Sequence, residues 1–213
     1  VAVWLNGNLT SEAKTIGSVN CIFRDENHRL AGTNTDGEAA LQTYEGTFGS
    51  VEGQTILVLG CGGAGRAVSS YFNKAVGNKG KLFVSNRSER TRAIVQTMGA
   101  NWIDWNAIEK VLPTINGLIN CTILGSETCI NETPLTNKQL NRLSPKTLVF
   151  DIIYQPSPTN LLRALAEKGC RTLDGKEMNL IQAVLAYKYV NPTTHNLHVT
   201  RNAMELIKQK IFG

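Results

Sequence analysis

Between residues 55 and 173 the chain alternates short apolar runs with amphipathic stretches. Thr55–Leu59 is a continuous apolar run, typical of a strand buried on both faces, and Lys81–Ser85 is a second strand candidate. Strands are also predicted at residues 117–121 and 147–153, and helices from the Gly-rich turn after residue 59 to about residue 72, at 89–98 and at 160–168 before Gly169. Strands that alternate with helices predict a doubly wound parallel sheet covered by helices on both faces, an α/β fold.

The segments on either side have different patterns. Residues 19–24 are predicted to form a strand that ends in a polar turn at 25–28, after one or two helical turns at Ser11–Ile16. Residues 37–44 are predicted to be helical behind a capping residue, and the Gly-rich residues 46–53 to be a linker. Residues 177–212 are predicted to be mostly helical, with a break near Asn191-Pro192.

Composition narrows the class of protein. The 213 residues are 42% hydrophobic and 18% charged, enough to bury a core and unlike a disordered, collagen-like or disulfide-stapled chain. No apolar run approaches the ~18 residues of a membrane span. Residues 1–8 lack the pattern of a signal peptide, so we expect a cytoplasmic protein.

The charged residues and cysteines exclude further classes. The net charge is +5, and the bases are scattered apart from Arg87, Arg90 and Arg92. This distribution favours an anionic small substrate or a phosphorylated cofactor over nucleic acid. The five cysteines contain no CxxC pair and the three histidines lack zinc-like spacing, so we expect free thiols and no metal site.

The turn after the first apolar strand carries the clearest chemical signal. Gly60-Cys61-Gly62-Gly63-Ala64-Gly65 has the GxGxxG spacing between a strand and a helix. There Gly60 allows the tight turn, Gly62 lets the backbone approach a pyrophosphate, and Gly65 lets the helix pack closely on the strand. The free N–H groups at the helix start then favour phosphate. The alternative is an ordinary turn of a sheet that binds no nucleotide.

The end of the second strand indicates which dinucleotide is bound. An NAD site normally has an acidic residue there, to bind the ribose hydroxyls, but this strand ends in Asn86, Arg87 and Ser88. A guanidinium suits a 2′-phosphate, so the sequence favours NADP over NAD. The alternative is that Arg87 caps a loop and faces solvent.

Asp36 is the best candidate for an acid–base residue. It lies among polar and small residues in Asn34-Thr35-Asp36-Gly37, where a carboxylate can bind a substrate hydroxyl and transfer a proton. From spacing alone, however, the stronger interpretation is that Asp36 caps the helix that follows.

Seven segments together resemble the shikimate dehydrogenase family, in the family's order and across nearly the whole chain. They are Gly17-Ser18-Val19-Asn20 (its GAVN), Asn34-Thr35-Asp36-Gly37 (its NTDG), residues 60–67 (its GAGGAxRA), Asn86-Arg87-Ser88 (its NRT), Asn120-Cys121-Thr122 (its NAT), Asp151-Ile152-Ile153-Tyr154-Gln155-Pro156 (its DxxYxP), and Met178 with Gln182 (its MLxxQ). The resemblance implies NADPH-dependent reduction of 3-dehydroshikimate to shikimate, in aromatic amino-acid biosynthesis.

The resemblance also implies roles for individual residues. Asp36 would be the acid of a catalytic Lys–Asp pair and would contact substrate, as would Asn20, Gln182 and Tyr154, the last of these near the nicotinamide. The cofactor would be held by Gly60, Gly62, Gly63, Ala64, Asn86, Arg87, Ser88, Arg92, Thr122 and Met178. The expected partners are small molecules, without nucleic acid, membrane or metal, and the expected state is a monomer or homodimer.

The chain departs from the family pattern at two places. The family's lysine, about twenty residues before the GAVN asparagine, falls before Val1, as does its Ser-x-Ser motif, and Lys14 is in the wrong place to substitute. We therefore expect the chain to be a fragment of a longer protein. The family's later arginine, five residues after Asn86, is replaced by Thr91 between Arg90 and Arg92.

Three parts are expected: residues 1–46 as the end of a smaller α/β substrate domain, 47–176 as the Rossmann-like NADP-binding domain, and 177–213 as helices that pack back toward the first part. The alternatives are a paralogue that binds NADP or a metabolite without catalysis, an NAD-using quinate/shikimate dehydrogenase, and a related reductase of another small cyclic substrate.

Overall fold

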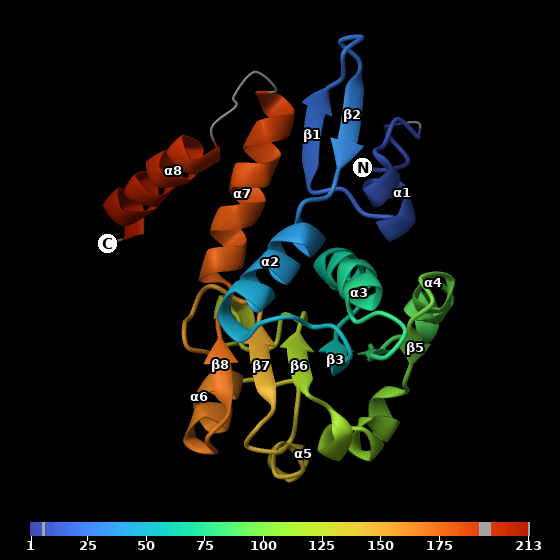
Figure 1. Ribbon diagram of the computed structural model, residues 1–213, viewed down its shortest axis with the longest axis vertical. Coiled ribbons are helices and arrows are strands. Elements are labelled where there is room, and N and C mark those ends of the chain that lie inside the picture. Colours follow the sequence, from blue (N-terminus) through green and yellow to red (C-terminus); the bar gives the residue numbers. More distant parts are fainter. Residues whose placement is uncertain (6, 192–196, 213) are drawn as a thin grey trace.

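A six-stranded sheet forms the centre of the computed structural model, which describes residues 1–5, 7–191 and 197–212 (Figure 1). Its strands are β3 (Thr55–Leu59), β4 (Lys81–Ser85), β5 (Asn101–Trp102), β6 (Gly117–Asn120), β7 (Leu148–Asp151) and β8 (Arg171–Leu173). Neighbouring strands pair in parallel in the order β5-β4-β3-β6-β7-β8. After β3, the next strands along the chain are added on one side of it as far as β5, and the later strands are added on the other side from β6 to β8. The switch point between β3 and β6 is where such sheets bind ligands. The predicted doubly wound sheet is confirmed.

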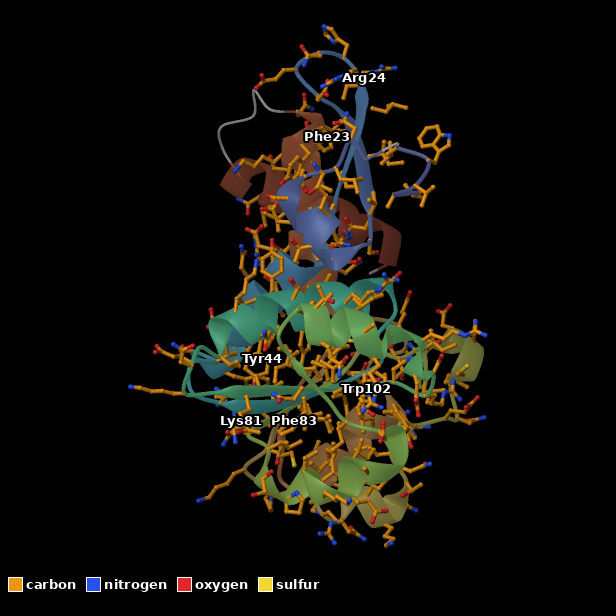
Figure 2. The ribbon with its side chains drawn as sticks, turned by 90° about the vertical axis from the view of Figure 1, so that its right-hand side faces the viewer. Phe23, Arg24, Tyr44, Lys81, Phe83 and Trp102 are labelled. Carbon is orange, nitrogen blue, oxygen red and sulfur yellow. The ribbon has the colours of Figure 1, made fainter. Side chains whose placement is uncertain are left out.

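The two faces of the sheet bury separate hydrophobic clusters because side chains alternate along each strand. On one face Ile56 and Val58 pack with α2 (Asp36–Phe48), α3 (Gly63–Ala75), α4 (Arg92–Thr97) and α7 (Lys176–Val190). On the other, Leu57 and Leu59 pack with α5 (Asn137–Leu140), α6 (Asn160–Glu167) and the 3-10 segments Trp105–Lys110 and Leu112–Thr114. Figure 2 shows the sheet nearly edge-on, with Tyr44 and Phe83 on opposite sides.

A smaller unit lies beyond α2 and α3 at the top of Figure 1. It consists of α1 (Ser11–Ile16) and an antiparallel hairpin of β1 (Cys21–Arg24) and β2 (Leu30–Thr33). The last turns of α7 pack against β1, where the rings of Phe23 and Tyr189 are 5.0 Å apart. Helix α8 (Leu197–Phe212) packs on α7, and Arg201 forms an ion pair with Glu177.

The structure corrects several predicted boundaries. The predicted linker at 46–53 was wrong in its first part, because α2 continues to Phe48, whose ring packs 4.9 Å from that of Tyr44. The predicted strands at 19–24, 117–121 and 147–153 are shorter. The predicted helix at 89–98 is a 3-10 turn at Glu89–Thr91 followed by α4. Strands β2, β5 and β8 were not predicted.

The C-terminal half of the prediction agrees better with the structure. Helix α6 ends before Gly169, which has φ +90°, and α7 ends at Val190 with Asn191 as its cap. Pro192, the other half of the predicted break, lies outside the described residues.

All five cysteines are free. In the described residues no helix is long and apolar enough to cross a bilayer, and no three metal-ligating side chains gather at one point.

Candidate functional site

The start of α2 brings Asp36 and Asn20 together. The Asn20 side-chain amide donates to Asp36 Oδ1 at 2.7 Å and to Thr35 Oγ1 at 3.1 Å, and its Oδ1 accepts from the Thr35 N–H. Thr35 is the N-cap position and Asp36 the first helical residue, so the interpretation of Asp36 as the helix cap was wrong. Burial raises the pKa of Asp36 above its ordinary value, while the bond from Asn20 opposes that rise. A carboxyl group poised in this way can exchange a proton with a bound hydroxyl.

Helix α7 reaches the same cluster from the opposite end of the chain. The Thr35 hydroxyl donates to the backbone carbonyl of Gln182 at 3.1 Å, so Gln182 lies beside the Asn20–Asp36 pair. The Gln182 side chain donates to Asn179 on its own helix. The substrate residues expected from the sequence at positions 20, 36 and 182 therefore lie together, although 162 residues separate the first from the last.

The Gly-rich turn combines two crowded glycines with one open position. Gly60 has φ +93°, and a Cβ there would lie 2.7 Å from the Cys121 carbonyl oxygen. A Cβ on Gly65 would overlap the Gly60 carbonyl. Because glycine has no Cβ, α3 can start this close to β3. A Cβ on Gly62, in contrast, would meet nothing within 4 Å. The space beside Gly62, at the start of α3, is therefore open for a ligand.

A cleft of about 540 Å³ opens from this turn. Residues 62–64, Thr122 and Tyr154 line it, together with other residues of the loops that follow β6 and β7. Two contacts bring the segment that precedes Asn20 to this turn. A Cβ on Gly63 would lie 2.8 Å from Ser18 Oγ, and Arg66 donates to the Gly17 carbonyl at 3.1 Å. Burial raises the pKa of the Cys121 thiol in the cleft wall well above its usual value, and the charges of Asp151 and Asp36 raise it further.

The polar residues that follow β4 differ in position, since two make hydrogen bonds within the local structure and one is exposed. Asn86 Oδ1 accepts from the Cys61 N–H at 3.2 Å and so holds the Gly-rich turn. Ser88 Oγ caps the 3-10 turn by accepting from the Arg90 N–H. Arg87 is exposed and lines a second cavity of about 520 Å³ with Trp105 and Leu124.

Two more of the predicted cofactor residues are held by other parts of the protein. Arg92 lies 3.8 Å from Asp104 in a half-exposed ion pair. Met178 is packed in the hydrophobic cluster between α7 and the sheet and is not among the residues that line the two cavities.

Below the cleft, a buried polar network joins the ends of β6 and β7. Asn120 and Asp151 are register partners on these strands, and the Asn120 amide donates to Asp151 Oδ1 at 3.1 Å. The Thr122 hydroxyl donates to Asn120 Oδ1 at 2.7 Å. The sequence interpretation assigned no site role to Asn120 or Asp151. The signal was present, since each is a polar residue that ends an apolar strand, and the carboxyl ends of neighbouring parallel strands meet at one edge of the sheet.

Comparison with curated proteins identifies the relatives of this chain. It is 32% identical to the NADP(+) shikimate dehydrogenase of Synechocystis sp. over 84% of this chain, and it spans 64% of that protein's length. It is 31% identical to the shikimate dehydrogenase (NADP(+)) of Desulforamulus reducens over 92% of this chain and 69% of that protein. The chain belongs to the shikimate dehydrogenase family. A comparison with models of protein families found no match.

Solved structures of the shikimate dehydrogenase family share the fold. The Thermus thermophilus shikimate 5-dehydrogenase, in complex with NADP(H) and shikimate, matches with a TM-score of 0.73 and 29% identity, over 84% of this chain and 64% of that one. The Corynebacterium glutamicum quinate dehydrogenase, in complex with NAD, matches with a TM-score of 0.78 and 26% identity, over 92% and 70%. The six-stranded sheet is thus the Rossmann-like sheet of these enzymes.

Two glycines of the Gly-rich turn are expected to respond differently to alanine. Gly65→Ala places a Cβ into the Gly60 carbonyl and is expected to destabilise the fold by about 1–3 kcal/mol, the usual range for overpacking. Gly62→Ala meets no protein atom and has extended backbone, so its melting temperature is expected to stay within a few degrees of the unaltered protein. It is expected to weaken dinucleotide binding, however, because its methyl group fills the open space.

Thermal melts and calorimetric titration with NADPH check this pair of substitutions. A Gly62→Ala protein that binds NADPH as well as the unaltered protein does would contradict the assignment of this turn to the pyrophosphate.

The buried carboxyl of Asp151 is expected to make stability depend on pH. Burial raises its pKa from 3.8 to about 6, against the hydrogen bonds that favour the charged form. Between these values the folded protein holds a proton that the unfolded chain has released. The free energy of unfolding therefore falls as the pH rises from about 4 to about 6, by on the order of 3 kcal/mol from this group.

The same measurement on Asp151→Asn isolates this effect. Urea unfolding at several pH values should show a steeper fall for the unaltered protein than for the variant, because other groups cancel in the difference. Parallel curves for the two proteins would show that Asp151 does not titrate in this range.

Proposed function

We propose that this chain forms the nucleotide-binding domain and part of the substrate site of an NADP-dependent shikimate dehydrogenase, which interconverts 3-dehydroshikimate and shikimate. The observation that carries the proposal is the closeness of two candidate sites. The Asn20–Asp36–Gln182 cluster begins two residues after Ser18, and Ser18 lies beside Gly63, in the wall of a cleft that starts at the Gly-rich turn near the switch point of the sheet.

The residues present fit an NADP molecule. The amides of residues 62–64 at the start of α3 would hold the pyrophosphate, in the space that Gly62 leaves open. The cavity at Arg87 and Trp105 would take the adenosine end, with the guanidinium on the 2′-phosphate. The cleft between Thr122 and Tyr154 would take the nicotinamide end.

The catalytic division of labour follows from these positions. The chemistry that NADPH would supply when bound is the hydride. Asp36 exchanges a proton at the substrate hydroxyl, and Asn20 keeps its carboxylate oriented by a 2.7 Å hydrogen bond. Asn20 and Gln182 hold substrate hydroxyls, and Tyr154, which is exposed on the cleft, contacts substrate near the nicotinamide.

In this proposal residues 1–46 complete a substrate domain, 47–176 bind the dinucleotide and 177–213 join the two. The contact of α7 with both α2 and β1 supports that arrangement.

An assay of the natural gene product with shikimate and NADP tests the proposal through the absorbance of NADPH. Turnover with shikimate is expected. Tight binding of NADPH without turnover of shikimate would instead support a paralogue that binds the cofactor without catalysis.

A second candidate is an NAD-using quinate/shikimate dehydrogenase, which the likeness to the Corynebacterium glutamicum quinate dehydrogenase in complex with NAD favours. The position of Arg87 on the adenosine cavity argues for NADP. The ratio of kcat/KM for the two cofactors, with shikimate and with quinate, decides between the candidates.

A further inference from the structure

Asp151 is a buried carboxyl that the proposed reaction does not use. Its side chain is 0% exposed at the end of β7. Oδ1 accepts from the Asn120 amide at 3.1 Å and from the Ile153 N–H at 3.1 Å, and Oδ2 accepts from the Thr159 hydroxyl at 2.8 Å. All three partners donate, so the position requires a group that accepts at both of its oxygens, as a carboxylate does.

The surrounding bonds fix the direction of each donor. Asn120 Oδ1 accepts from both the N–H and the hydroxyl of Thr122, which turns the Asn120 amide nitrogen toward Asp151. Thr159 Oγ1 accepts from the Leu162 N–H at the start of α6, so its own proton is directed to Asp151. The Asn120 amide also donates to the Leu124 carbonyl at 3.4 Å. These bonds orient the donors, and Asp151 is the carboxylate that accepts from both Asn120 and Thr159.

This network lies directly under the wall of the cleft. One branch runs through Asn120 to Thr122, whose Oγ1 also accepts from the Leu124 N–H at 3.1 Å. The other holds the N–H of Ile153, the residue before Tyr154. Thr122, Ile153 and Tyr154 all line the cleft. One buried carboxylate thus fixes the loop after β6 relative to the loop after β7.

We propose that Asp151 is a positioning residue, which holds these two loops at the spacing that the nicotinamide end of NADPH and Tyr154 require. The proposal rests on the proposed function. Asp151 is 0% exposed and is not among the residues that line the cleft, so its effect on a ligand there would pass through Thr122 and Tyr154. Loops that are already ordered lose less conformational entropy when a ligand binds. Loss of the Asp151 hydrogen bonds is therefore expected to weaken the binding of the nicotinamide end alone.

The experiment compares two ligands on the full chain. NADPH occupies both ends of the site, whereas 2′,5′-ADP carries the adenosine and 2′-phosphate without the nicotinamide. Asp151→Asn keeps the size of the side chain but replaces one acceptor oxygen by a donor. It is expected to raise the Kd of NADPH about tenfold, the effect of roughly one lost charge-assisted hydrogen bond. The Kd of 2′,5′-ADP is expected to stay within about twofold.

Two further substitutions separate positioning from general loss of stability. Leu148→Ala, at the other end of β7, is the control that destabilises the same strand and is expected to leave both affinities unchanged. Thr159→Val removes one donor to Asp151 from a residue that is 1% exposed, and it is expected to weaken NADPH binding selectively, whereas Thr159→Ser keeps the hydroxyl and is expected to rescue it.

The outcomes distinguish this role from the proposed function. Unchanged NADPH affinity in Asp151→Asn, or equal weakening of both ligands, overturns the positioning role and leaves the proposed function intact. If the unaltered chain binds neither ligand, the proposed function fails and the positioning role fails with it. Selective weakening of NADPH in Asp151→Asn and Thr159→Val, but not in Leu148→Ala, establishes the positioning role.

Discussion

Asp36→Asn is expected to lower the kcat of the natural gene product by about 10²–10⁴-fold, the usual contribution of a positioned proton-transfer group. Asparagine keeps an oxygen that can accept the 2.7 Å hydrogen bond from Asn20, so the local structure is expected to survive. It cannot exchange a proton at the substrate hydroxyl. The loss should therefore fall on kcat, while NADPH binding, which we propose takes place in the cleft at the Gly-rich turn, stays close to that of the unaltered protein.

Glu38→Gln is the matched control for this substitution. Glu38 lies in the first turn of the same helix and accepts a hydrogen bond from Gln42, away from the Asn20 cluster. Glu38 and Asp36 are both carboxylic acids in the first turn of α2. Glu38→Gln therefore shows the effect of removing a carboxylate near the helix start without changing Asp36. Steady-state kinetics with shikimate and NADP measures both variants. If Asp36→Asn kept more than about a tenth of the activity, a role of Asp36 in proton transfer would be excluded.

The central sheet could be predicted because its strands carry their own signal. Residues 56–59 are all apolar because both faces of β3 are buried under helices, and the Gly spacing that follows marks the turn. Strands β5 and β8 could not be predicted in this way. They are short and partly exposed, and they exist because each pairs with a longer neighbour at the edge of the sheet.

The candidate site was predicted from motifs rather than from local physics. Spacing alone favoured Asp36 as a helix cap, but the N-cap is Thr35. The Asp36 side chain instead accepts a hydrogen bond from Asn20, which lies in the segment before the hairpin. The contact of Gln182 with Thr35 depends on how α7 packs, which no local pattern encodes. The Asp151 network is the opposite case, since two polar residues that end adjacent apolar strands already indicate a polar cluster at the carboxyl edge.

Arg87→Gln is expected to raise the Kd of NADPH by roughly 10–150-fold, which corresponds to the loss of hydrogen bonds to a charged group worth about 1.5–3 kcal/mol. The Arg87 side chain is exposed on the cavity that it lines with Trp105, and its guanidinium can bind a phosphate through two parallel N–H groups. NADH lacks the 2′-phosphate, so its affinity is expected to change by less than about threefold, apart from any stacking of the guanidinium on adenine.

Arg92→Gln is the informative comparison, because the sequence placed both arginines at the cofactor. Arg92 lies 3.8 Å from Asp104, which already neutralises much of its charge. Its substitution is therefore expected to raise the Kd of NADPH by less than about threefold, within the small range typical of exposed ion pairs. Titrations of each variant with NADPH and NADH separate the two residues. Equal losses for both cofactors in Arg87→Gln would show that Arg87 contacts the common adenosine, and the preference for NADP would then have to come from Arg90 or Arg92.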